Sequence, residues 1–135
     1  NVHQQARQAM HGMVRELRQS RNQDITITSG GATIEFTIPQ SLMSDPITYY
    51  QPIRYYISSN QVIREHPLGT TSVLANNAKS LSFCFWDDVN DVCCDLLAED
   101  CSGIEVMQIS LDTEKDVRGK DLGFSVIEKV KVRNE

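Results

Sequence analysis

The chain has 135 residues, of which 40% are hydrophobic and 23% are charged, and its formal net charge is −5. This length and composition predict one globular domain with a substantial apolar core, and they exclude an intrinsically disordered chain. The acidic balance argues against nucleic acid as the main partner, because phosphate binding needs a basic surface. No apolar run approaches the roughly 20 residues that cross a membrane as a helix.

Residues 2–20 are predicted to form an amphipathic helix, because apolar side chains recur there at spacings of three and four. The apolar stripe consists of Val2, Ala6, Ala9, Met10, Met13 and Leu17. We expect this stripe to pack partly on a sheet, and Val2, Ala6, Met10, Met13 and Leu17 also to contact other subunits. The sequence begins without an initiator Met, without an N-cap signal and without a signal peptide. We therefore expect it to start partway along its gene product, in a helix that continues upstream.

After Asn22 the helical spacing gives way to alternating apolar and polar residues, which is typical of strands. Hairpins are predicted over residues 25–38, turning at 29–31, and over residues 53–65, turning at Ser59 and Asn60. The alternation predicts further strands at 81–85, 104–111 and 124–132. Residues 40–52 and 112–121 are expected to be loops, and 73–81 to include a short helical turn. One helix followed by about seven antiparallel strands predicts an α+β fold, with the helix packed on the sheet.

Charge is distributed unevenly along the chain. The stretch from Asn1 to Arg21 carries Arg7, Arg15, Arg18 and Arg21 against Glu16 alone, whereas Cys84 to Cys101 contains six acidic residues and no Lys or Arg. An acidic loop and a basic helix of this kind can meet across a subunit contact. Two separately solvated faces explain the same pattern.

The four cysteines, Cys84, Cys93, Cys94 and Cys101, lie in one short stretch. Their even number predicts disulfides formed in an oxidising compartment, and the two C-x2-C pairs typical of a zinc site are missing. Antiparallel pairing of strands 81–85 and 104–111 would bring Cys84 next to Cys101, and we favour that disulfide. Two other complete pairings remain open: 84–93 with 94–101, and 84–94 with 93–101.

Motifs for catalysis are not found in the sequence, which has no nucleophile elbow, zinc-protease helix, P-loop or dinucleotide-binding glycines. His3, His11 and His66 are expected to be surface residues. We therefore predict no catalytic residues, no enzymatic activity and no cofactor.

Three acidic residues of the cysteine-rich stretch, Asp87, Asp88 and Asp91, offer the oxygen ligands that calcium prefers. Their spacing departs from that of an EF-hand loop, and a solvated loop is the favoured interpretation.

Several segments, taken in order, resemble the type IV pilin-like superfamily. RQAMHGMVRELRQSRNQDI (7–25) resembles the exposed half of the N-terminal helix and its exit, and YYISSNQVIREH (55–66) a hairpin of the family. VLANNAKSLSFCF (73–85) is similar to a strand segment of minor pilins and pseudopilins, while MQISLD (107–112) and VKVRN (130–134) resemble the last strands. The chain looks most similar to the J-type minor pseudopilins of type II secretion and the W-type minor pilins.

The resemblance implies a pilin-like fold, with residues 1–22 as the exposed half of the helix and 23–135 as a β-rich head. It implies a non-catalytic subunit that assembles with other minor pilin-like subunits at the tip of a type IV pilus or a secretion pseudopilus. A hydrophobic helix upstream would anchor the protein in the inner membrane, facing the periplasm or a cell-surface filament. The cysteine-rich loop 84–103 departs from the family pattern. An alternative role is therefore a tip pilin that uses this loop to bind a ligand in adhesion or DNA uptake.

Overall fold

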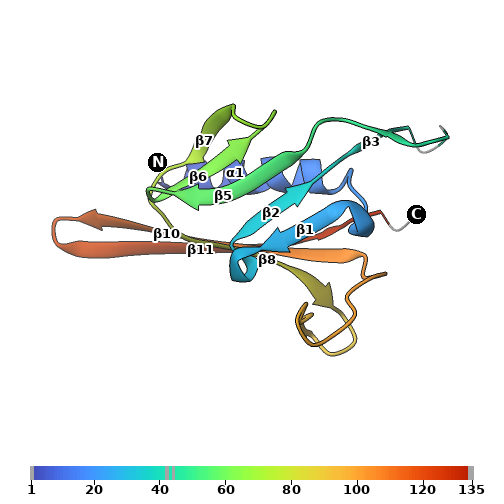
Figure 1. Ribbon diagram of the computed structural model, residues 1–135. Helices are drawn as coiled ribbons and strands as arrows, with labels where there is room; N and C mark the ends of the chain where they lie inside the picture. Colours follow the sequence, from blue (N-terminus) through green and yellow to red (C-terminus); the bar gives the residue numbers. More distant parts are fainter. Residues whose placement is uncertain (1, 42, 44, 134–135) are drawn as a thin grey trace.

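The computed structural model describes residues 2–41, 43 and 45–133 and shows one α-helix and three β-sheets in that part of the chain (Figure 1). Helix α1 covers Val2–Leu17, so the predicted helix is confirmed except for its last three residues. Short 3-10 turns lie at η1 (Asn22–Asp24) and η2 (Ser29–Gly31).

The largest sheet has five antiparallel strands in the order β1-β2-β5-β6-β7. Their bounds are β1 (Ile25–Thr28), β2 (Thr33–Phe36), β5 (Ile53–Ser58), β6 (Gln61–Glu65) and β7 (Thr71–Ala75). The second sheet has the order β11-β10-β8-β9, with β8 (Ala78–Asp87), β9 (Val92–Cys93), β10 (Val106–Val117) and β11 (Lys120–Lys131). A small ribbon pairs β3 (Pro39–Ser41) with β4 (Thr48–Tyr49) inside the predicted loop 40–52.

The predicted α+β, pilin-like fold class is wrong, because antiparallel sheet dominates the protein: 50% of the described residues are in strands and 17% in helices. Two mistaken segments account for much of the difference. Residues 73–81 form parts of β7 and β8 instead of a helical turn, and residues 112–121 extend a long β10–β11 hairpin instead of a loop.

The two predicted hairpins are confirmed, and local backbone conformation explains their turns. Ile25 pairs with Phe36 across the first hairpin. The turn of the second has Ser59 and Asn60 at φ of 51° and 60°, the left-handed pair that matches strand twist in a two-residue turn.

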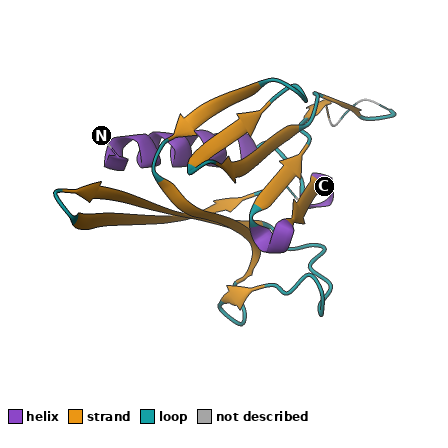
Figure 2. Ribbon diagram, turned by 60° about the vertical axis from the view of Figure 1, so that its left-hand side comes forward, coloured by secondary structure: helices purple, strands orange, loops and turns teal. Residues whose placement is uncertain are grey.

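Helix α1 contacts both large sheets, lying against β7 of one and against β10 and β11 of the other (Figures 1 and 2). The apolar stripe of the helix is buried there, and one hydrophobic core joins the helix to both sheets. Its largest fully buried side chains are Met10, Met13, Leu17, Ile34, Phe36, Tyr55, Val62, Met107, Ile109 and Leu111. Burial of these apolar side chains is the main stabilising contribution that fixes the helix to the sheets.

A polar network also holds α1 against the five-stranded sheet. The Arg64 guanidinium donates to both Glu16 carboxylate oxygens, at 2.9 and 2.7 Å, and the Tyr55 hydroxyl donates to the same carboxylate. Arg64 and Glu16 side chains are 27% and 21% exposed. The hydrogen bonds that Arg64 donates to Glu16, opposed in part by burial, raise the pKa of Arg64 above its ordinary value. Sequence patterns pointed to Glu16 only as the lone acid on a basic helix.

We expect Arg64→Ala to lower the free energy of unfolding by about 1–2 kcal/mol, because Glu16 would keep its half-buried charge without its cation. The matched control is Arg54→Ala on the neighbouring strand β5. Arg54 pairs with Glu35 at 2.7 Å, where the two side chains are 37% and 40% exposed, and with Glu65 at 3.5 Å. The Glu65 carboxylate would keep its 2.8 Å hydrogen bond from the Gly69 N–H, so the loss of Arg54 should cost less than about 1 kcal/mol. Urea unfolding of both variants measures the difference, and equal losses would contradict a bracing role for Glu16.

Candidate functional site

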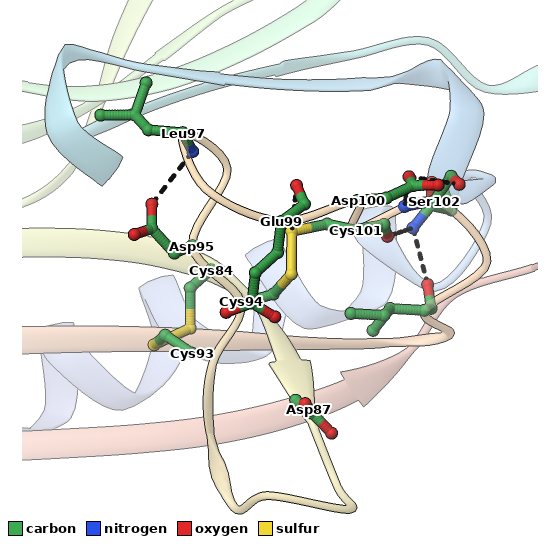
Figure 3. Close-up of a disulfide and its surroundings, with 12 residues drawn as sticks. Cys84, Asp87, Cys93, Cys94, Asp95, Leu97, Glu99, Asp100, Cys101 and Ser102 are labelled. Atoms are coloured by element: carbon green, nitrogen blue, oxygen red, sulfur yellow. Dashed lines mark hydrogen bonds between the residues drawn. A yellow bond between two sulfur atoms is a disulfide. The ribbon is translucent and has the colours of Figure 1, made fainter.

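The cysteine-rich segment is closed by two disulfides, Cys84–Cys93 and Cys94–Cys101, whose Cα atoms are 5.6 and 6.0 Å apart (Figure 3). The predicted Cys84–Cys101 disulfide is therefore wrong, and one of the open alternatives is the observed pairing. Strands β8 and β10 do pair antiparallel, but Cys84 lies opposite Gln108.

The short strand β9 explains why Cys84 meets Cys93. After a turn, β9 returns along β8 with Trp86 opposite Cys93 and Asp87 opposite Val92. The next residue, Cys94, donates its backbone N–H to the Phe85 carbonyl at 2.8 Å. Cys94 and Cys101 are 7% and 6% exposed and belong to the hydrophobic core, so the second disulfide ties the base of the loop to the protein interior.

The carboxylates of three loop aspartates order the loop backbone. Asp87 accepts from the N–H groups of Val89 and Asn90, Asp95 from that of Leu97 at 3.0 Å, and Asp100 from that of Ser102 at 3.0 Å. Such bonds are the usual means by which aspartate fixes turns.

These hydrogen bonds also lower two carboxyl pKa values. The Asn90 side chain, helped by backbone N–H groups, holds the pKa of Asp87 below its ordinary value, and the Ser102 hydroxyl does the same for Asp100. The ionised carboxylates of Asp87 and Asp100 therefore stabilise these turns at any pH above the ordinary carboxyl pKa. This stabilisation is lost as the pH falls through the lowered pKa values of the two residues.

The weak calcium candidates Asp87, Asp88 and Asp91 do not form a ligand cluster in the structure. Asp87 uses its carboxylate within the turn, including a 2.8 Å bond from the Asn90 side-chain amide. Among the described residues, no group of three or more His, Cys, Asp or Glu side chains is arranged to hold a metal ion.

Aliphatic side chains project from the acidic segment into solvent. Val89 is 92% exposed and Leu97 is 99% exposed, while Val92 and Leu96 are about half exposed. We use the name acidic loop for residues 87–100, which carry Asp87, Asp88, Asp91, Asp95, Glu99 and Asp100 and no basic side chain. A disulfide-fixed loop that displays apolar tips between carboxylates has the features of a contact surface for another protein.

The predicted subunit-packing face of the helix is corrected by its burial. Val2, Ala6, Met10, Met13 and Leu17 are between 0% and 9% exposed. These side chains fill the protein's own core, so they are not free to contact a neighbouring subunit. The opposite face of α1 is the exposed one.

A stripe of basic and imidazole side chains runs along that exposed face of α1. Its members are His3, Arg7, His11 and Arg15 of the helix and Arg18 directly after its end, all of them exposed, as was predicted for His3 and His11. Spacings of four and three residues place them on one side of the helix. We call these five residues the basic stripe.

A groove lies between the basic stripe and the edge strand β11. Its lining consists of Arg7, Met10 and His11 from the helix and Phe124, Ser125, Val126, Ile127 and Glu128 from the strand. The His3 ring stacks on Phe124 at 4.3 Å between centroids, and the Arg7 guanidinium lies 5.7 Å from the same ring. We call this surface the α1–β11 groove. Alternation predicted Phe124 in a strand, but nothing in the sequence indicated that it would meet the helix.

Two further clusters were missed by sequence reasoning and are structural. The buried Arg21 bonds Asp24 at 2.7 Å and the Tyr49 hydroxyl, which attaches the β3–β4 ribbon to the end of α1. The Lys129 ammonium lies 3.9 Å from the centre of the Trp86 ring, beside the first disulfide. Long-range contacts of this kind leave no periodic signal in a sequence.

Comparisons with known proteins add no assignment. No known family model matches the sequence, and a search of curated proteins found no match. In the described part of the chain, no helix combines the length and the apolarity required to cross a bilayer.

Proposed function

We propose that this chain belongs to a non-catalytic minor subunit of a type IV pilin-like filament, either a type IV pilus or the pseudopilus of type II secretion. The observation that carries the proposal is the two-sided helix α1. One side is buried against both sheets, and the other exposes the basic stripe along the length of the helix. An assembly subunit needs both sides, because the helix has to pack against the β-sheets of its own subunit and also contact neighbouring subunits.

The order of the sequence motifs supports the same role, from the segment 7–25 to the segment 130–134. The two disulfides fit an oxidising compartment such as the periplasm. In the proposed arrangement a hydrophobic helix upstream anchors the subunit in the inner membrane, and other minor pilin-like subunits are its partners. The subunit helps to start or cap the filament by protein–protein contacts.

A second candidate role is favoured by the acidic loop. The nearly complete exposure of Val89 and Leu97 on a loop closed by two disulfides suits a tip subunit that binds a ligand through that loop. Adhesion to a surface and uptake of DNA are the two activities of such tip pilins. The acidic charge of the loop suits adhesion better, because DNA would be repelled by the six carboxylates.

The test is copurification of the intact gene product, tagged and expressed in its own cells, with the minor subunits encoded beside it. The proposal expects at least one pilin-like subunit to copurify in defined stoichiometry and the filament or secretion activity to fail when the gene is deleted. Normal filament assembly in the deletion strain, together with turnover of a substrate by the purified protein, would contradict the proposed role.

A further inference from the structure

A polar pocket of about 390 Å³ lies over β1, β2 and β5, on the face of the five-stranded sheet that is turned away from the core (Figure 1). Ile34, Phe36 and Tyr55 are buried in the core, so the residues that alternate with them occupy this outer face. Every side chain that lines the pocket carries a hydroxyl or a charge: Thr26, Thr28, Ser29, Thr33, Glu35, Arg54 and Tyr56. Small-molecule sites measure roughly 300–1,000 Å³ and are mostly apolar, so this pocket has the size of a ligand site but suits a polar ligand.

Regular strand pairing holds the lining side chains in two rows. Thr26, Glu35 and Arg54 lie opposite one another across three neighbouring strands. Thr28 lies opposite Thr33 in the next row. Side chains fixed on paired strands lose little freedom when a ligand binds, which favours recognition of a small molecule.

The η2 turn contributes Ser29 to the pocket and is itself held close to the second sheet. Gly31 of this turn approaches β8 so closely that a Cβ atom there would lie 3.2 Å from the Phe83 carbonyl oxygen. The lining is therefore fixed on the side of the turn as well as along the strands.

The hydroxyls of the lining are available to a ligand. In the described part of the chain, no hydrogen bond from another protein group occupies those of Thr26, Thr28, Ser29, Thr33 or Tyr56. The Tyr56 ring adds the one aromatic surface of the lining. Aromatic faces carry partial negative charge, which attracts weakly polarised C–H groups.

The charges of the pocket do not favour an anion. The Arg54 Nε and Nη2 atoms both donate to Glu35 Oε1, at 3.2 and 2.7 Å, and Nη1 donates to Glu65 at 3.5 Å. One guanidinium between two carboxylates leaves a local charge of −1, so a phosphate or carboxylate ligand would be repelled. Glu35 Oε2 has no hydrogen-bond partner among the described residues and can accept from a ligand hydroxyl.

We propose that this pocket binds a neutral pyranose saccharide. Such a ligand has the required chemistry, because its ring presents C–H groups on one face and hydroxyls around its edge. The sugar ring packs on Tyr56, its hydroxyls donate to Glu35 Oε2, and they exchange hydrogen bonds with Thr28 and Thr33. The inference goes beyond the proposed assembly role and does not depend on it, since the pocket contains no residue of the acidic loop or the basic stripe.

NMR titration of the 135-residue chain with the methyl glycosides of glucose, galactose and mannose measures this binding. At least one of the three should shift the backbone amide signals of Thr28, Thr33 and Tyr56 saturably. The expected dissociation constant is about 1–10 mM, because the pocket is open and the ligand is small. The proposal is overturned if no glycoside gives a saturable shift at these residues up to about 100 mM.

Two variants of the pocket remove the proposed contacts, and each has a matched control. Tyr56→Ala should weaken binding about tenfold through loss of the aromatic surface. Its control is Tyr50→Ala, since Tyr50 is a 54% exposed tyrosine outside the pocket. Thr28→Val with Thr33→Val should weaken binding about fivefold through loss of the hydroxyls.

The hydroxyl control is Thr71→Val, because Thr71 is exposed on β7 at the opposite edge of the same sheet. Both control variants should bind like the wild type. The amide spectrum of each variant shows whether it is folded. Folded Tyr56→Ala protein with wild-type affinity would overturn the proposed site, and so would equal losses in the pocket and control variants.

A charge test does not depend on absolute affinity. The wild type should bind the neutral glycoside at least about fivefold more tightly than the corresponding uronide, which carries a carboxylate at C6. In Glu35→Gln, Arg54 faces one carboxylate fewer, so the ratio of uronide to glycoside affinity should rise about tenfold. Misfolding cannot produce that gain. A wild type that prefers the uronide, or an unchanged ratio in Glu35→Gln, overturns the inference.

The saccharide site and the assembly role can fail separately. A protein that binds none of the glycosides but still copurifies with other minor subunits overturns this pocket and leaves the proposed function standing. Saccharide binding by a protein that copurifies with no pilin-like subunit supports the pocket and contradicts the assembly role.

Discussion

Replacement of Leu17 by Asp should leave the protein largely unfolded at 25 °C. Leu17 is 0% exposed at the end of α1, within the core shared by the helix and both sheets. Truncation of such a leucine to Ala costs about 2–5 kcal/mol, and an unpaired buried carboxylate adds several kcal/mol more. The sum is comparable with the roughly 5–15 kcal/mol that stabilises a typical domain.

Circular dichroism and urea unfolding of Leu17→Ala and Leu17→Asp give the measurement. The neighbouring exposed residue offers the control, because Arg18→Ala should change the unfolding free energy by less than about 0.5 kcal/mol. Wild-type stability of Leu17→Asp would mean that the helix is not part of the core. The face of α1 available to other subunits would then have to be reassigned.

Removal of the second disulfide, by Cys94→Ala with Cys101→Ala, is expected to have the next largest effect. Cys94 and Cys101 are separated by 7 residues in the sequence, and closing so short a loop stabilises by about 2.5 kcal/mol in the chain-entropy model. Both cysteines are also buried, so their replacement leaves unfilled space in the core. The Cys84→Ala and Cys93→Ala pair should lose less, because Cys93 is exposed.

Thermal unfolding compares the stability of the two double variants. Peptide mapping tests the disulfide connectivity on which this prediction depends. No Lys or Arg lies between Lys79 and Lys115, so one tryptic peptide carries all four cysteines. Partial reduction, alkylation and fragmentation of that peptide should recover Cys84 joined to Cys93 and Cys94 joined to Cys101. Recovery of Cys84 joined to Cys101 would contradict the loop structure.

Local patterns predicted the elements that depend on neighbouring residues. The apolar spacing from Val2 to Leu17 identified the helix, and the alternation in 25–38 and 53–65 identified two hairpins. These signals work because each element has one buried face, which fixes the period of its apolar residues.

The errors in the fold arose where burial does not follow a simple period. Residues 73–81 cross from one sheet to the other, and Asn77 there has a left-handed φ of 59°. The change of sheet breaks the alternation, so that Val73, Leu74, Ala78 and Leu81 imitate helical spacing. In the β10–β11 hairpin the backbone ladder continues through charged residues such as Lys115, and the turn at Arg118 and Gly119 lies well past the predicted loop start.

The candidate surfaces were only partly predictable for a similar reason. Composition revealed the acidic loop and the basic helix, and it placed the cysteines together. The pairing of Cys84 with Cys93 depends on β9, a strand of 2 residues that is too short to show alternation. The α1–β11 groove depends on Phe124 meeting His3, a contact between opposite ends of the chain.

The most direct test of the role as an assembly subunit is position-specific cross-linking in living cells. A photo-reactive amino acid at Arg15, on the exposed side of α1, reports what lies against the helix in the assembled machine. The account predicts a cross-link to a pilin-like subunit, another copy of this chain included, and none from the same probe at the exposed Lys115. If the probe at Arg15 captures no pilin-like subunit while the protein is folded and the filament is assembled, the central claim is contradicted.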